Sequence, residues 1–157
     1  GEINSQVQVK ILKELAQAKG IENVVEATVT ASSEVMQGAQ SLVGRVDAIY
    51  VPTDNTAVSA YATIVQVAEE NKIPLFAGEA RPIEQGGVGT FALDYYELGK
   101  QTALMAVRVL EGENPGEMAI ETQKDPQLII NKAGAERLEI TISEELLTRA
   151  DKIIEEN

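Results

Sequence analysis

Four consecutive polar residues, Thr53-Asp54-Asn55-Thr56, follow an apolar run and precede an amphipathic stretch. Their hydroxyl, amide and carboxylate groups could hold a ligand carboxylate or carbonyl, because the first turn of a helix has unpaired backbone N–H groups and partial positive charge. The Asp54 carboxylate could also pair with a ligand ammonium group. The same residue types are the usual helix caps, with Asn55 or Thr56 as the expected cap here, so the pattern leaves both interpretations open.

Two further polar clusters follow the next apolar runs. Glu79 and Arg81 could bind the two charged groups of a zwitterion. The alternative interpretation is that both residues belong to a solvated loop. Asp94 is followed by Tyr95 and Tyr96, and two aromatic rings beside a carboxylate can stack on a flat or cationic ligand. The alternative for this third cluster is a helix start capped by Asp94.

The first amphipathic stretch begins with Asn4 and Ser5, which are natural N-caps and could also donate hydrogen bonds to a ligand. Its apolar residues recur at helical spacing. They predict an inner helix face made of Val7, Ile11, Leu12, Leu15 and Ala18. An alternating fold would place a strand before this helix, so the sequence is expected to be a fragment, cut at a loop.

Apolar runs joined by amphipathic helices are typical of a buried parallel sheet. Strands are predicted over 23–29, 47–51, 74–77, 88–93 and 127–131, with an edge strand or an extended link over 117–122. Helices are predicted over 6–19, 34–43, 57–71, 95–110, 132–138 and 143–154, with a turn or short helix over 81–85. The expected fold is one α/β lobe over 1–157, three-layered, mainly parallel and flavodoxin-like, with ligands bound beyond the carboxyl ends of the strands.

The composition excludes several classes of function. A net charge of −12 argues against binding to nucleic acid, which needs clustered Lys and Arg. The absence of Cys and His excludes thiol and imidazole nucleophiles and the usual zinc sites. Neither a P-loop nor a dinucleotide-binding glycine pattern occurs, so no cofactor is expected. A metal site made of Asp54, Glu79 and Asp94 is conceivable, but carboxylates at strand ends are common, and no metal is expected.

One alternative from the residues is a signalling or enzyme domain. Response-regulator receivers share the alternation of strand and helix, and Asp54 could then be the phosphoacceptor. Those domains also need an acidic pair after the first strand and a Lys after the fifth, whereas the late strand here ends in Leu93-Asp94 without a Lys. A flavodoxin-like or receiver-like domain is therefore kept as the second interpretation.

A more specific likeness runs through the chain in order. The stretches SLVGRVDAIYVPTDNT at 41–56, DYYELGKQT at 94–102, LIINKA at 128–133 and ITISEELL at 140–147 carry it. The chain resembles the ABC-transporter substrate-binding proteins of the tryptophan or aromatic amino-acid uptake type. This resemblance covers only the second half of such a protein.

The resemblance implies a type I periplasmic-binding architecture, in which two α/β lobes joined by a hinge hold the ligand between them. Such a protein is not an enzyme: it captures a small solute, here an amino acid, and passes it to an ABC permease. The parent protein would be an extracellular or periplasmic lipoprotein. The residues that match cleft positions are Asn4, Ser5, Thr53, Asp54, Asn55, Thr56, Glu79 and Asp94, with Asp54, Asn55 and Thr56 expected at the α-amino and carboxylate groups.

The same resemblance makes residues 95–125 a segment that crosses to the other lobe and returns. The apolar face of helix 95–110 would then need a partner, since exposed apolar surface is unfavourable by about 25 cal/mol per Å². The helix is expected either to fold back onto this lobe or to pair with another chain as a homo-oligomer. A third interpretation is a dissected half-receptor without binding activity.

Overall fold

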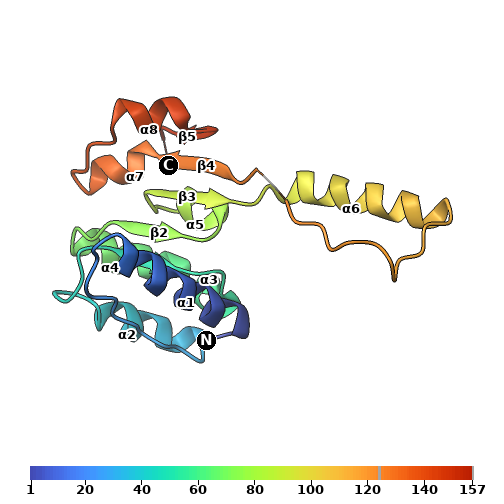
Figure 1. Ribbon diagram of the computed structural model, residues 1–157. Helices are drawn as coiled ribbons and strands as arrows, with labels where there is room; N and C mark the ends of the chain where they lie inside the picture. Colours follow the sequence, from blue (N-terminus) through green and yellow to red (C-terminus); the bar gives the residue numbers. More distant parts are fainter. Residues whose placement is uncertain (124, 157) are drawn as a thin grey trace.

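The computed structural model describes residues 1–123 and 125–156 (Figure 1). Residue 124, inside the segment 95–125, and residue 157 lie outside the described residues. The elements in chain order are α1 (Ile3–Ala18), η1 (Ser32–Glu34), α2 (Val35–Gln40), β1 (Ile49–Val51), α3 (Asn55–Ser59), α4 (Tyr61–Glu70), β2 (Leu75–Ala77), α5 (Ala80–Glu84), β3 (Gly89–Ala92), α6 (Tyr95–Leu110), β4 (Gln127–Asn131), α7 (Lys132–Arg137), α8 (Glu144–Arg149) and β5 (Lys152–Ile154).

The strands form one sheet in the order β1-β2-β3-β4-β5. The pairs β1–β2, β2–β3 and β4–β5 are parallel, and β3–β4 is antiparallel. The predicted α/β fold with a mainly parallel sheet is therefore confirmed. Because β1, β2 and β3 run in the same direction, their carboxyl ends lie at one edge of the sheet. We call this edge, made of residues 52–54, 78–79 and 93–94, the cleft edge.

The hydrophobic core lies on one face of the sheet and is almost entirely aliphatic. Along β1 and β2 the buried residues alternate with exposed ones, so that one side of each strand faces α2 and α4. The core residues that these elements share are Val35, Ala39, Leu42, Ile49, Val51, Tyr61, Ile64, Val65, Ala68, Leu75 and Ala77.

The opposite face of the sheet is less completely covered. Strand alternation and register place Tyr50, Phe76 and Phe91 on it, and these side chains are 38%, 38% and 60% exposed. Helix α1 covers part of this face near the cleft edge: a Cβ built on Gly78 would lie 3.1 Å from the Tyr50 hydroxyl and 3.3 Å from Gln8 Oε1. Helices thus lie on both faces, as predicted.

Helix α1 starts earlier and faces differently than the sequence predicts. Its N-cap is Glu2, so Asn4 and Ser5 lie in the first turn, and the capping prediction for them was wrong. The residues buried in α1 are Ser5 and Ala16. Most of the predicted inner face points outward, with Val7, Ile11 and Leu15 54%, 50% and 60% exposed. Polar contacts of the first turn, described below, turn the helix this way.

The predicted strand over 23–29 is also wrong. These residues are extended, but no element of the described chain forms a ladder with them. A Val- and Thr-rich segment becomes a strand only when its backbone finds a partner, and β1 lies across a groove from it. The segment 117–122 forms no strand either: it begins in a turn closed by the Glu117 N–H donating to Asn114 O at 2.9 Å, and residues 119–122 have no regular structure.

The helices predicted over 57–71 and 143–154 differ from those in the structure. The helix predicted over 57–71 is divided into α3 and α4 at Ala60, whose backbone leaves the helical region. The last predicted helix ends at Arg149, because Ala150 is extended. The residues after it form β5, which is anchored by the Asp151 N–H donating to Leu128 O at 2.9 Å and by the Leu128 N–H donating to Asp151 Oδ2 at 2.8 Å.

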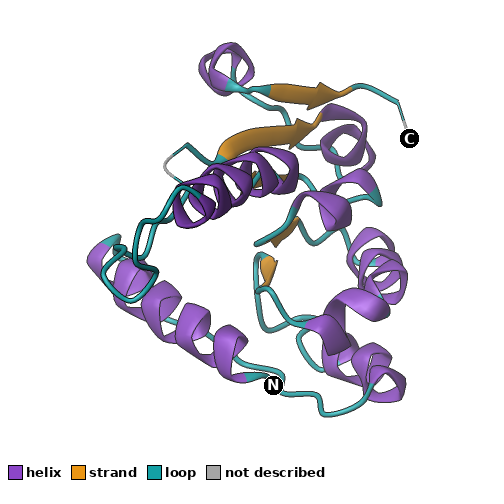
Figure 2. Cartoon of the chain, turned by 90° about the vertical axis from the view of Figure 1, so that its right-hand side faces the viewer, coloured by secondary structure: helices purple, strands orange, loops and turns teal. Residues whose placement is uncertain are grey.

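Helix α6 has the predicted bounds and projects away from the sheet (Figure 1). Figure 2 looks toward this projection, with the strands behind it. None of its residues is buried, and Leu104 and Leu110 are 68% and 86% exposed. Arg108 pairs with Glu113 and Glu121 and so holds the returning segment against the helix. Of the two expected alternatives, fold-back onto the lobe does not occur in the described chain, since no residue of α6 is buried; pairing with another chain stays a prediction.

Two buried polar side chains allow a test of this packing. Asn131 Nδ2 donates to Ile83 O at 2.7 Å, and its Oδ1 accepts from the Gly134 N–H at 2.8 Å. The Tyr61 hydroxyl is buried without a hydrogen-bond partner among the described residues, and burial raises the pKa of Tyr61.

We expect Asn131→Ala to lower the free energy of unfolding by about 2 kcal/mol, because it leaves the buried Gly134 N–H unpaired and removes one of the two hydrogen bonds to Ile83 O, which still accepts from the Gly86 N–H. Tyr61→Phe should leave this free energy unchanged or raise it, since it removes an unpaired buried hydroxyl. Urea unfolding followed by circular dichroism measures both. A loss for Tyr61→Phe as large as that for Asn131→Ala would contradict the assigned packing.

Candidate functional site

The cleft edge is joined to the first turns of α1 by two hydrogen bonds to one residue. Asn4 Nδ2 donates to Thr53 O at 2.7 Å, and the Thr53 N–H donates to Gln8 Oε1 at 2.9 Å. Asn4 and Gln8 are one turn apart and therefore lie on the same side of the helix. Together they hold both backbone polar groups of Thr53, which fixes the path of the chain as it leaves β1.

The Asp54 carboxylate is buried at this edge and accepts three hydrogen bonds. It is only 4% exposed. Its Oδ2 accepts from the Ser5 hydroxyl at 2.8 Å and from the Glu2 N–H at 3.1 Å, and its Oδ1 accepts from the Ala57 N–H at 3.1 Å. Asp54, and not Asn55 or Thr56, therefore caps α3, and the same carboxylate joins the start of α1 to the start of α3.

Two opposing effects set the charge state of Asp54. Burial raises the pKa of its carboxyl, whereas hydrogen bonds from Glu2, Ser5 and Ala57 lower it, and their sum holds the pKa below its ordinary value of 3.8. Asp54 is therefore ionised at neutral pH. A buried carboxylate that already accepts three hydrogen bonds positions its neighbours more readily than it binds a ligand.

Asn55 and Thr56 are more exposed to solvent than Asp54. Asn55 is exposed, and its Nδ2 donates to Glu2 Oε2 at 3.0 Å. Thr56 is half-buried, and its side chain has no hydrogen bond to any described residue. Both stand in the first turn of α3, where donors face the cleft edge.

Glu79 stands at the end of β2 and before α5. It is half-buried, and its carboxylate forms no ion pair or hydrogen bond with the rest of the described chain. A Cβ placed on the neighbouring Gly78 would lie 3.1 Å from the Tyr50 hydroxyl, 3.2 Å from Thr53 Oγ1 and 3.3 Å from Gln8 Oε1. A glycine here leaves room for three polar atoms to converge at the end of β2.

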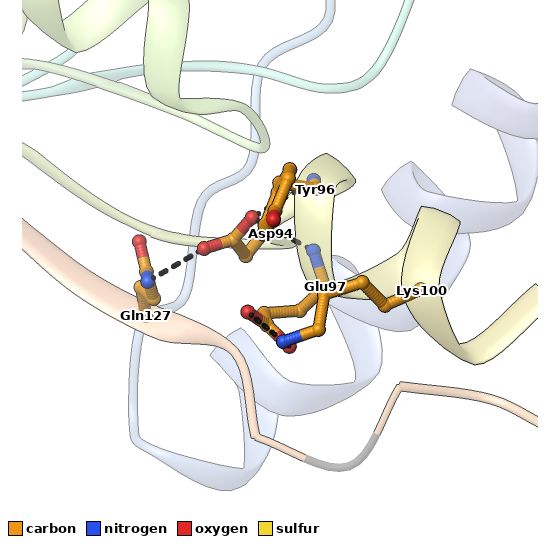
Figure 3. Close-up of polar contacts among 5 residues, drawn as sticks. All are labelled: Asp94, Tyr96, Glu97, Lys100 and Gln127. Carbon is orange, nitrogen blue, oxygen red and sulfur yellow. Dashed lines mark hydrogen bonds and ion pairs between the residues drawn. The ribbon is translucent and has the colours of Figure 1, made fainter.

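Asp94 lies where the chain leaves the sheet, and Figure 3 shows its contacts. Its Oδ1 accepts from the N–H groups of Tyr96 and Glu97 at 2.9 and 3.2 Å, so the predicted cap is confirmed. Its Oδ2 accepts from Gln127 Nε2 at 2.9 Å. Asp94 therefore joins the outgoing chain to the returning one. Lys100 lies 5.5 Å from the centre of the Tyr96 ring and pairs with Glu97.

The structure brings together only part of the predicted site. Five of its residues lie in one group made of two hydrogen-bonded sets: Asn4 and Thr53 bond with each other and with Gln8 in the first, and Ser5, Asp54 and Asn55 bond with Glu2 in the second. Glu79 and Asp94 share the cleft edge with this group without a hydrogen bond to it. In the described chain, no group of three or more acidic side chains is arranged to hold a metal ion.

Four residues of this edge were not predicted from the sequence: Glu2, Gln8, Tyr50 and Gln127. Gln8 follows Asn4 by one helical turn, a signal that was available. Tyr50 and Gln127 could not be found this way, because their places depend on the strand register. Among the described residues, no helix is long and apolar enough to cross a membrane.

Comparison with known proteins gives consistent results. Residues 1–154 match the family described as ABC transporter substrate binding protein. A tyrosine-binding protein of Clostridioides difficile is 40% identical over 131 residues, which are 83% of this chain and 38% of that protein.

Two solved structures are also similar. One is an ABC domain in complex with L-Trp from Streptococcus pneumoniae, with a TM-score of 0.88 and 32% identity, covering 96% of this chain and 51% of that one. The other is the ligand-free, open form of a substrate binding protein with adhesive properties from Clostridium difficile, with a TM-score of 0.76 and 38% identity, covering 99% and 52%. The chain thus spans about half the length of these structures, and 38% of the length of the tyrosine-binding relative.

The Asp54 network yields a prediction with a defined pH dependence. We expect Asp54→Asn to lower the free energy of unfolding by about 2 kcal/mol at neutral pH, because an amide cannot accept from all three donors. The folded pKa is depressed, so the stabilisation is present above 3.8 and is lost as the pH falls through the folded pKa.

The difference in free energy of unfolding between the unchanged chain and Asp54→Asn should therefore shrink below pH 3.8. Urea unfolding at a series of pH values would measure it. Asp47→Asn is the matched control, because Asp47 is exposed and has no described hydrogen bond. A difference between the chain and Asp54→Asn that stays constant from neutral to acid pH would refute the role given to the ionised carboxylate.

Proposed function

The chain belongs to the family of ABC transporter substrate-binding proteins, transport components that are not enzymes, and we propose that it is the lobe that captures an amino acid, preferentially an aromatic one. In the parent protein, this lobe would close with a second lobe over the ligand and deliver it to an ABC permease. The parent would act outside the cytoplasm, as an extracellular or periplasmic lipoprotein.

The observation that carries this proposal is the position of α6. The helix leaves the cleft edge directly after Asp94, projects away from the sheet with its apolar side chains exposed, and its return strand begins beside the same residue at Gln127 (Figure 1). The chain would thus pass to the second lobe after Asp94 and return before Gln127, and one hydrogen bond joins these two residues. A hinge consists of a few such residues at the ends of elements. Residues 95–125 would then extend into the second lobe.

We assign the cleft residues two kinds of role. Ser5 and Asp54 are buried and hold the loop in place. The groups that remain accessible are Asn4, Thr53, Asn55, Thr56, Glu79 and Asp94. The backbone N–H groups in the first turn of α3, around Asn55 and Thr56, suit the carboxylate of an amino acid. The Glu79 carboxylate, which has no partner in the described chain, suits the ammonium group.

Aromatic selectivity would come from the hinge. Tyr95 and Tyr96 stand beside Asp94 and are 66% and 74% exposed. Aromatic rings at such positions can stack on a flat side chain. The relatives that are named for tyrosine and bound to L-Trp support an aromatic ligand. The receiver-like interpretation has no support here, since the Asp54 carboxylate is buried and accepts three hydrogen bonds from the chain itself.

Ligand binding is tested by thermal unfolding with L-Trp, L-Tyr, Gly and a neutral sugar. We expect the aromatic amino acids to raise the melting temperature, with a stabilisation of about 2.7 kcal/mol at a ligand concentration one hundred times the dissociation constant. Glu79→Gln should weaken the effect, and Glu14→Gln, an exposed carboxylate on α1, should not. No shift with any amino acid would mean that this half alone has no binding activity.

The exposed face of α6 gives a separate prediction. We expect the chain to self-associate through this face, because its apolar residues contact no second lobe. Leu104→Glu should shift the sedimentation velocity profile toward the monomer. Ile120→Glu, at a residue that is 96% exposed outside the helix, is the control. A monomeric chain at all concentrations would contradict this expectation.

A further inference from the structure

A hollow of about 310 Å³ is lined by residues of α3, α4 and α5. Its volume is at the lower end of the range of small-molecule sites, which is about 300–1,000 Å³. Val58 and Ala62 contribute apolar surface from α3 and α4. Arg81 and Gln85 stand one turn apart at α5 and contribute a guanidinium and an amide. One wall of the hollow is therefore apolar and the other is rich in hydrogen-bond donors.

The Arg81 guanidinium is exposed and forms no ion pair or hydrogen bond with another described residue. This distinguishes it from the other arginines of the described chain, whose guanidinium groups have a partner. Those arginines are Arg45, which donates to a backbone carbonyl, and Arg108, Arg137 and Arg149, which pair with glutamates. A guanidinium presents five N–H donors in a rigid fork that matches the two oxygens of a carboxylate. All the donors of Arg81 are thus available to a ligand.

The hollow reverses the charge of the chain locally. The chain carries 25 Asp and Glu against 13 Lys and Arg, a net charge of −12, yet none of the described residues that line the hollow is acidic. Arg81 gives it a single positive charge, and no carboxylate is there to bind an ammonium group. The side-chain amide of Gln85 has no hydrogen bond within the described chain and can donate to the same anion. These groups select a negative charge and reject a zwitterion.

We propose that this hollow binds a small free carboxylate that has a short aliphatic body and no ammonium group. Arg81 would hold both carboxylate oxygens, Gln85 would donate to one of them, and the aliphatic body would lie against Val58 and Ala62. The site differs from the amino-acid site, because Glu79 does not line it. Since Arg81 and Gln85 are exposed, water competes for these contacts and the binding should be weak.

This inference does not rest on the proposed transport function, and its test uses no amino-acid ligand. The probe is sodium isobutyrate, titrated into the isotope-labelled chain at constant ionic strength while NMR follows the amide and guanidinium signals. We expect saturable shifts at the amides of Val58, Ala62 and Gln85 and at the Arg81 guanidinium. Isobutyramide is the control probe, because it has the same shape without the charge and should give no saturable shift over the same concentrations.

Variants of the chain make the test specific. Arg81→Gln removes the guanidinium and should weaken isobutyrate binding at least about tenfold. Arg81→Lys keeps the charge but loses the fork, so it should weaken binding by a smaller factor. Arg45→Gln is the matched control, because it removes the same charge from an exposed arginine that does not line the hollow. The amide spectra of the unliganded variants check that each remains folded.

Four results would overturn the proposal. The first is the absence of saturable shifts with isobutyrate. The second is an equal response to isobutyramide, which would show apolar contact without recognition of the anion. The third is equal weakening by Arg45→Gln and Arg81→Gln, which would show a general effect of net charge. The fourth is tighter binding of N-acetyl-alanylalanine than of isobutyrate, which would assign the hollow to the carboxylate of a peptide end.

Discussion

The arrangement of the cleft edge depends on the buried carboxylate of Asp54. Helix α1 buries little apolar surface, so its attachment to the lobe is largely polar. The Asp54 carboxylate accepts hydrogen bonds from Glu2 and Ser5 at the start of that helix. It also caps α3, which begins where the loop after β1 ends. One ionised group therefore sets the relative position of two helix N-termini, and burial makes each of its hydrogen bonds stronger than it would be in water.

Much of the fold followed from local patterns. The apolar runs of β1, β2, β3 and β4 and the periodicity of α6 were sufficient, because a short apolar run and helical spacing are properties of neighbouring residues. Residues 23–29 and 152–154 were mispredicted for a common reason. Strand formation depends on whether a distant edge is available, and the edge of β4 is available to β5 while that of β1 lies across a groove.

The site shows a similar division. The sequence located the polar clusters at the strand ends but could not assign their roles. Asp54 and Glu79 are both acidic residues after short strands, yet one is buried among three donors and the other has no described partner. This difference arises from α1, which reaches residues 53 and 54 from far away in the chain. Which carboxylate is structural and which is available for a ligand is therefore a property of tertiary contacts.

The antiparallel pairing of β3 with β4 has a consequence for the segment that joins these two strands. Ala92 and Gln127 face each other in the ladder, so β3 and β4 form a hairpin whose loop contains everything from residue 93 to residue 126. The entropy of closing a loop rises only slowly with its length, by about 0.6 kcal/mol for each doubling. Large changes in that loop should therefore leave the sheet nearly undisturbed, which makes this hairpin a tolerant place to exchange, lengthen or graft the material beyond it.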